Sequence, residues 1–110
     1  MSIEIRKTGE IDRVGIQGDL DFHSTTEVRG ELAKLAERQS LKVLIDLKNV
    51  AYVDSSGLAA FIELFQKMKR YGGKMILFNL TPGVKKIFDV ARLDMILKIA
   101  KDTQEAESFL

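Results

Sequence analysis

Residues 42–58 read KVLIDLKNVAYVDSSGL, a hydrophobic segment that ends at Asp54-Ser55-Ser56-Gly57 before an amphipathic helix. The nearly continuous apolar run Leu41–Leu47 is typical of a strand covered by helices, which predicts a central place in a sheet. The first turn of a helix has N–H groups without intrahelical partners and a partial positive charge, so it favours an oxyanion or a phosphate. Because two hydroxyls stand at this helix start, we predict the functional site there.

The segment after Asp54 has the clearest helical pattern of the chain. Its apolar residues follow the i, i+3, i+4, i+7 spacing of one helix face: Leu58, Phe61, Ile62, Phe65 and Met68. Gly72-Gly73 predicts the end of this helix, since glycine adopts positive φ without strain. A buried strand is predicted over 75–78. Thr81 is the predicted N-cap of a third helix over 82–91, with Pro82 at its first position.

Two half-exposed antiparallel strands are predicted at the start of the chain. Apolar residues alternate with polar ones on both sides of a turn at 8–10, at Ile3, Ile5, Val14 and Ile16. Gly18-Asp19-Leu20-Asp21 follows as a short acidic connection. Ser24 and Glu27 have the spacing of a capping box, which predicts that the first helix begins near Thr25.

The order of these elements predicts the α/β class. We expect a last short strand within 93–99 and one more helix start at Asp102, which gives about four α-helices. The N-terminal hairpin is antiparallel and the strands joined by helices are parallel, so the sheet is small and mixed. Sites in such sheets gather beyond the carboxyl ends of parallel strands, where Asp54-Ser55-Ser56-Gly57 stands.

Bulk composition limits the possible functions. The chain has 110 residues, the size of a single domain over residues 1–110, and 17 basic against 16 acidic residues give a net charge of +1. That balance predicts no attraction to nucleic acid or to an anionic membrane. No apolar run approaches 18 residues and the N-terminal segment alternates, so we expect a cytoplasmic protein. With no cysteine and only His23 as histidine, we predict no metal and no cofactor.

The serine pair also has other interpretations. Asp54 or Ser55 can be only an N-cap, the commonest role of such residues at a helix start. A nucleophilic serine needs a base, and the chain offers only His23 and no glycine-x-serine-x-glycine elbow, so a serine hydrolase is disfavoured. Failure of an active-site serine probe to label Ser55 would weaken that reading further. Gly57 stands alone, so no phosphate-binding glycine loop is predicted.

Two further groups of residues have ordinary interpretations. Asp19, Asp21 and Asp54 carry carboxylates that could bind a hard cation, although such residues more often cap turns. The methionines at 68, 75 and 95 are predicted to fill the core.

Four segments together resemble the anti-sigma factor antagonists, small single-domain members of the STAS family, over essentially the whole chain. They are Gly18-Asp-Leu-Asp21, Leu44-Ile-Asp-Leu47 with Val53-Asp-Ser-Ser-Gly-Leu58, Tyr71-Gly-Gly-Lys74, and Thr81-Pro-Gly-Val-Lys-Lys-Ile-Phe88. The second segment is the most diagnostic. The resemblance implies a single STAS domain with a STAS-like fold.

The resemblance also implies a partner-switching function. In that family an unphosphorylated antagonist captures an anti-sigma factor that is also a serine kinase, which frees the sigma factor. The kinase then phosphorylates the antagonist and releases it, and a serine phosphatase resets the cycle. The kinase supplies nucleotide and metal, so the antagonist itself is expected not to be an enzyme. The main alternative is a STAS module that scaffolds another signalling assembly or regulates a transporter.

The family's residue roles carry over to matching positions of this chain. The phosphorylated hydroxyl directly follows the motif aspartate, which is Ser55 here, and Ser56 supports it. Asp21 and Asp54 are expected to orient the site or face the nucleotide end of the kinase, and Asp19 would join them if the acidic connection lies alongside. The remaining expected site residues are Gly57, which shapes the turn, and His23 and Ser24, which extend the contact surface.

Overall fold

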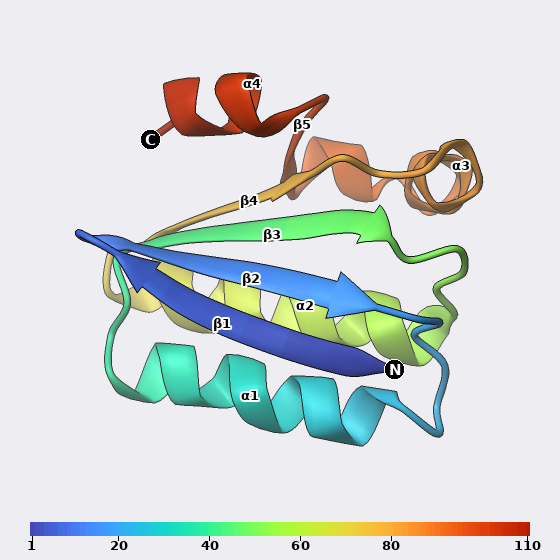
Figure 1. The fold of residues 1–110 in the computed structure, drawn as a ribbon, viewed down its shortest axis with the longest axis horizontal. Coiled ribbons are helices and arrows are strands. Elements are labelled where there is room, and N and C mark those ends of the chain that lie inside the picture. The colour runs from blue at the N-terminus through green and yellow to red at the C-terminus, as the bar shows by residue number, and fades with distance from the viewer.

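The structure, a computed structural model, describes residues 1–110 and contains a five-stranded sheet and four α-helices (Figure 1). The strands are β1 (Ser2–Thr8), β2 (Ile11–Gln17), β3 (Lys42–Asn49), β4 (Lys74–Phe78) and β5 (Lys98–Ala100). The helices are α1 (Thr25–Glu37), α2 (Ser55–Arg70), α3 (Pro82–Val90) and α4 (Thr103–Ser108), and a short 3₁₀ helix covers Leu93–Met95.

The sheet is mixed, as the sequence predicts. The strand order is β1-β2-β3-β4-β5, so β3 is central. β1 and β2 pair antiparallel, whereas β2–β3, β3–β4 and β4–β5 pair parallel. The predicted fold class, a small mixed sheet with an N-terminal hairpin and about four helices, is confirmed.

The two faces of the sheet are covered unequally. Figure 1 shows α1 and α2 on one side of the sheet, whereas α4 lies on the other side near β4 and β5. The larger core contains Ile45 with Phe61 and Phe88, and the smaller core contains Leu44 with Ala106. Neighbouring residues of β3 thus belong to different cores. This explains the continuous apolar run of the central strand, since both of its faces are buried.

The predicted capping box at Ser24 and Glu27 is wrong. Ser24 has helical backbone angles, and its hydroxyl donates to the Asp19 carbonyl at 2.7 Å instead of accepting from the first turn of α1. The Asp21 carboxylate accepts the N–H groups of His23 at 3.0 Å and Ser24 at 3.2 Å. The chain already turns at Asp21, so its carboxylate accepts the Ser24 N–H that the box assigned to the Glu27 side chain.

The start of α3 is predicted correctly, but the cap is not. Thr81 is the N-cap residue and Pro82 opens the helix, yet the Thr81 side chain makes no cap hydrogen bond. Its hydroxyl donates to the Val50 carbonyl at 3.0 Å, which ties the start of α3 to the end of β3. By contrast, Asp102 caps α4 as predicted, since its carboxylate accepts the Glu105 N–H at 2.9 Å.

The buried face of α2 is wider than the predicted stripe. Phe61 and Met68 are buried as predicted, whereas the other predicted positions, Leu58, Ile62 and Phe65, are only half-buried. The fully buried set also includes Gly57, Ala60 and Leu64. Helix α2 contacts both the sheet and α1, so more than one stripe is covered.

The methionines are not all core residues. Met68 and Met75 are buried, but the prediction for Met95 is wrong because 80% of this residue is exposed. Met95 lies at the end of the 3₁₀ helix, in which Leu93 is the buried residue.

A cluster around one buried carboxylate lies at the end of the sheet opposite to the predicted site, and no sequence pattern predicted it. Asp12 is fully buried in β2, and its carboxylate accepts from the Arg38 guanidinium at 2.5 Å and from the Ser40 hydroxyl. Burial, together with the charge of Asp12, raises the pKa of Tyr71. This cluster joins the end of α1 to the sheet.

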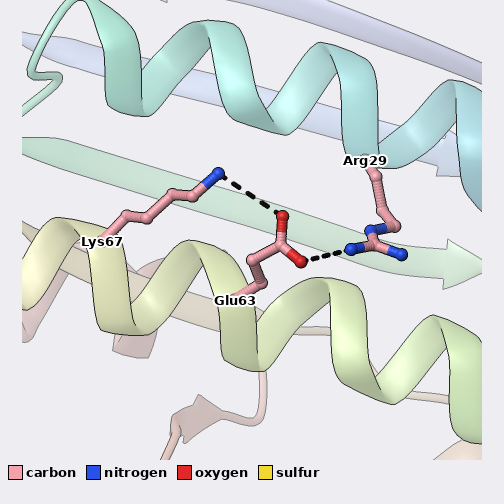
Figure 2. Close-up of polar contacts among 3 residues, drawn as sticks. All are labelled: Arg29, Glu63 and Lys67. Atoms are coloured by element: carbon pink, nitrogen blue, oxygen red, sulfur yellow. Dashed lines mark hydrogen bonds and ion pairs between the residues drawn. The ribbon is translucent and has the colours of Figure 1, made fainter.

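Helices α1 and α2 are joined on their exposed side by an ion-pair network (Figure 2). The Glu63 carboxylate accepts from Arg29 of α1 at 2.5 Å and from Lys67 of α2 at 3.4 Å. The hydrogen bond from Arg29 is the largest cause that lowers the pKa of Glu63 below its ordinary value, and burial opposes it. The ionised form of Glu63 therefore stabilises the packing of the two helices.

We expect Glu63→Gln to lower the free energy of unfolding by about 0.5 kcal/mol at pH 7, the size of a partly exposed ion pair. The pKa of Glu63 is lower in the folded state than in the unfolded state, so its ionisation stabilises the fold at pH values above the unfolded-state pKa. This stabilisation is lost as the pH falls through the folded-state pKa. The difference from wild type should therefore shrink at pH 3. Urea unfolding of both proteins at pH 7 and pH 3 measures it.

Glu37→Gln is the matched control for this prediction. Glu37 is an exposed residue of α1, and no ion pair involves it. Its replacement should change stability little at either pH. An equal loss for Glu63→Gln at both pH values would contradict the assigned role of the carboxylate.

Candidate functional site

The acidic connection after β2 lies directly beside the turn before α2. The Leu20 N–H donates to the Tyr52 carbonyl at 2.9 Å, and the Asp54 N–H donates to the Leu20 carbonyl at 2.9 Å. Leu20 and Val53 form an isolated parallel bridge. The two segments thus extend the pairing of β2 and β3 beyond their carboxyl ends, which is where the sequence placed the site.

Asp54 is the N-cap of α2 and the centre of the site. One carboxylate oxygen accepts from the Ser56 hydroxyl at 2.6 Å, the Ser56 N–H at 2.9 Å and the Gly57 N–H at 3.2 Å. The other oxygen accepts the Phe22 N–H at 3.1 Å, across the two loops. The Ser56 hydroxyl is the main cause that lowers the pKa of Asp54, and the three N–H donors add to it against the effect of burial. Asp54 is therefore ionised at neutral pH.

The two serines have different environments. Ser56 is half-buried; its hydroxyl donates to Asp54 and lies 3.2 Å from the Thr25 hydroxyl. Ser55 is exposed at the first position of α2, and its hydroxyl makes no hydrogen bond within the chain. The Ser55 hydroxyl is thus free to meet another molecule, whereas that of Ser56 is held by the protein.

Gly57 allows α2 to begin close to the neighbouring loop. A Cβ atom at this position would lie 2.8 Å from Val53 Cγ1, 3.0 Å from Leu20 Cβ and 3.1 Å from the Leu20 carbonyl oxygen. These distances leave no room for a side chain at residue 57. The glycine therefore fixes the distance between the helix start and the acidic connection, and with it the position of Ser55.

The other predicted site residues differ in how they take part in this turn. Asp21 is half-buried and organises the turn before α1 through its carboxylate, and Ser24 joins that turn to Asp19. The side chains of Asp19 and His23 are exposed, and the His23 ring packs on Phe22 with centroids 4.0 Å apart. No hydrogen bond joins His23 to either serine, although a nucleophilic serine needs a base within reach.

The family model described as the STAS domain matches residues 2–106. The chain belongs to the STAS domain family. The anti-sigma-B factor antagonist of Bacillus subtilis (strain 168) is 32% identical over 104 residues, which cover 94% of each chain.

Solved structures share the fold of this STAS domain. An anti-sigma factor antagonist from Mycobacterium paratuberculosis aligns with a TM-score of 0.89 at 15% identity, over 97% of this chain and 91% of the other. The Bacillus cell fate determinant SpoIIAA in its phosphorylated form aligns with a TM-score of 0.75 at 18% identity, over 99% and 100%. The family resemblance predicted from the four sequence segments is confirmed.

Sequence reasoning missed three residues of the site in this STAS domain. Thr25 is buried, and its hydroxyl donates to the Asp21 carbonyl at 2.6 Å as well as contacting Ser56. Phe22 and Tyr52 are large apolar residues, yet 69% and 49% of their surfaces are exposed. Their position in loops, outside any periodic apolar pattern, was the available signal for the two aromatic residues.

None of the helices has the length and apolar character needed to cross a membrane. No three histidine, cysteine or acidic side chains come together where they could hold a metal ion.

Proposed function

We propose that this STAS domain is an anti-sigma factor antagonist that works by partner switching. Its unphosphorylated form binds an anti-sigma factor with serine kinase activity and so frees a sigma factor. Phosphorylation of Ser55 ends this binding, and a serine phosphatase restores it. The observation that carries the proposal is the free, exposed Ser55 hydroxyl beside a fully bonded Asp54 at the start of α2.

A phosphate on Ser55 is compatible with the fold. It adds a charge of about −1.5 to −2, and a helix N-terminus favours negative charge. The lowered pKa of Asp54 shows that the unphosphorylated site already holds one negative charge beside this helix start. The phosphate therefore affects the surface and leaves the core unchanged.

The same phosphate opposes docking of a partner. The surface around Ser55 already carries Asp54 together with Asp19 and Asp21 on the neighbouring loop. A bound partner must desolvate the added charge or meet it with new cations. A hundredfold loss of affinity corresponds to about 2.7 kcal/mol, which one unpaired charge at an interface supplies.

Exposed aromatic side chains flank the acceptor. Phe22 and Tyr52 lie on the two loops that the Leu20 and Val53 bridge joins. Aromatic anchors surrounded by polar residues are typical of interface hot spots. We infer that the kinase presents apolar pockets for these rings and basic groups for the carboxylates around them.

The remaining residues have supporting roles in this mechanism. Asp54 joins the two loops and Asp21 holds its own loop. Ser56 and Gly57 shape the turn, and His23 and Ser24 extend the contact surface. The kinase supplies the nucleotide and its metal ion, so the antagonist acts as substrate and ligand and needs no catalytic group of its own.

The test is incubation of the protein with a cognate anti-sigma factor kinase and Mg-ATP, followed by intact mass and peptide mapping. We expect a mass gain of one phosphate, located on Ser55. Ser56→Ala is the matched control and should still accept the phosphate. Modification of Ser56 alone, with Ser55 untouched, would overturn the assignment.

A further inference from the structure

The outer edge of β1 has no partner within the chain. β1 is the first strand of the sheet, and only β2 pairs with it. A two-residue turn joins Thr8 to Ile11, which are opposite each other in the register. Such a turn makes Thr8 and Ile11 a hydrogen-bonded pair, and bonded and non-bonded pairs then alternate along the strands. The backbone N–H and C=O groups of Ile3, Ile5 and Lys7 therefore point outward.

The sequence of β1 is complementary to itself when read in the opposite direction. In an antiparallel pair with Ile5 facing Ile5 of the partner subunit, Glu4 lies opposite the partner's Arg6, and Ser2 lies opposite the partner's Thr8. Ile3, Ile5 and Lys7 are then the hydrogen-bonded positions, which agrees with the outward direction of their backbone groups. Opposite charges and hydroxyl pairs at facing positions stabilise antiparallel strands.

We propose that β1 of one molecule pairs antiparallel with β1 of a second copy around a two-fold axis at Ile5. The two five-stranded sheets then form one continuous sheet across the pair. Glu4 and Arg6 are exposed and bond only to each other within the chain, at 2.8 Å, so both are available to the partner. Facing side chains approach most closely at the non-hydrogen-bonded positions, which Glu4 and the partner's Arg6 occupy.

The face of β1 next to α1 has room for the second strand. An open groove of about 440 Å³ lies there, lined by Ile5, Lys7, Glu31, Lys34 and Arg38. Ile5 is only half-buried in the single chain. Ile5 of the partner subunit would lie against Ile5, the one apolar residue of this groove, and the contact removes apolar surface of both side chains from water.

The charges of β1 also select the partner. Charged residues on an edge strand normally prevent pairing with other chains. A strand of another protein would place no matching charges opposite Glu4, Arg6 and Lys7. In a pair of identical copies, Glu4 of each molecule faces Arg6 of the other, which gives two pairs of opposite charges. The contact uses one seven-residue strand from each molecule, so the dimer is weak and transient.

The proposed dimer goes beyond the partner-switching function and leaves it intact. Ser2 pairs with Gln17, so the Ser55 site lies beyond the Ser2 end of β1. The two-fold axis directs the Ser55 sites of the two copies toward opposite ends of the joint sheet. Both sites stay free, and the pair becomes a bivalent ligand for a kinase.

Cysteine cross-linking tests the register, because the natural chain contains no cysteine. Ser2→Cys and Thr8→Cys face each other between copies at a non-hydrogen-bonded position, where Cα atoms lie about 4.5 Å apart, within disulfide range. Under mild oxidation we expect disulfide heterodimers when the two variants are mixed, and at least tenfold less dimer with either variant alone. Intact mass measures both products. No heterodimer, or equal cross-linking with the single variants, would overturn the proposal.

Charge exchange provides the second test. Adding Glu4→Arg to both cysteine variants places like charges opposite each other and should reduce heterodimer formation about tenfold. Adding Glu4→Arg together with Arg6→Glu restores opposite charges and should restore the yield. A lower yield with the double exchange as well would contradict the proposed pairing. Circular dichroism confirms folding of each variant, and the assay needs no kinase, so its outcome is independent of the proposed function.

Discussion

Ser55→Ala is expected to abolish phosphate transfer from the kinase. The affinity of the variant for the kinase should stay within about twofold of that of the unphosphorylated wild type. The Ser55 hydroxyl makes no hydrogen bond in the chain, so its removal leaves α2 and the Asp54 cap unchanged. Phosphate incorporation measured with labelled ATP, and calorimetric titration with the kinase, give the two quantities. Loss of affinity on a par with loss of phosphate transfer would contradict this separation.

Ser55→Glu should instead weaken kinase binding at least tenfold, or about 1.4 kcal/mol. The carboxylate adds one negative charge beside the ionised Asp54 at the docking surface, less than a phosphate adds. Ser55→Gln is the matched control of the same shape without the charge. Equal affinities for the Glu and Gln variants would show that charge does not drive release.

The fold was predictable because local and global signals agree along the chain. The apolar run of β3 indicated burial on both faces, and the structure places it at the centre of the sheet. Alternating residues defined the hairpin, and Pro82 and Gly72 marked a helix start and a helix end. At Gly72 the backbone has φ of +82°, the conformation that the glycine pair predicted.

The site was predictable only in part, since side-chain partners distant in sequence cannot be read from spacing. Asp54 was a candidate cap within its own segment, but its bond to the Phe22 N–H joins residues 32 positions apart. The contact between Thr25 and Ser56 spans 31 positions. The error at Ser24 has a different cause, since two local arrangements compete there and the carboxylate of nearby Asp21 accepts the Ser24 N–H that the capping box assigned to Glu27.

Gly57→Ala is expected to lower the free energy of unfolding by about 2 kcal/mol, as overpacking of a tight site does. The new methyl group would lie 2.8 Å from Val53 Cγ1 and 3.0 Å from Leu20 Cβ. Either α2 or the acidic connection must then move, which costs more than the roughly 1 kcal/mol that alanine gains over glycine inside a helix. Urea unfolding measures the change.

Gly30→Ala is the matched control for this substitution. Gly30 is an exposed residue of α1, and a Cβ atom there meets nothing within 4 Å. The same chemical change should therefore stabilise the protein by about 1 kcal/mol, so the two variants shift stability in opposite directions. A Gly57→Ala protein as stable as wild type would show that the helix start can move away from Leu20 at no cost. If the start of α2 moves at a cost in stability, Ser55 moves with it. Gly57→Ala should then also slow phosphorylation, because the position of the Ser55 hydroxyl depends on the close contact of Gly57 with Leu20 and Val53.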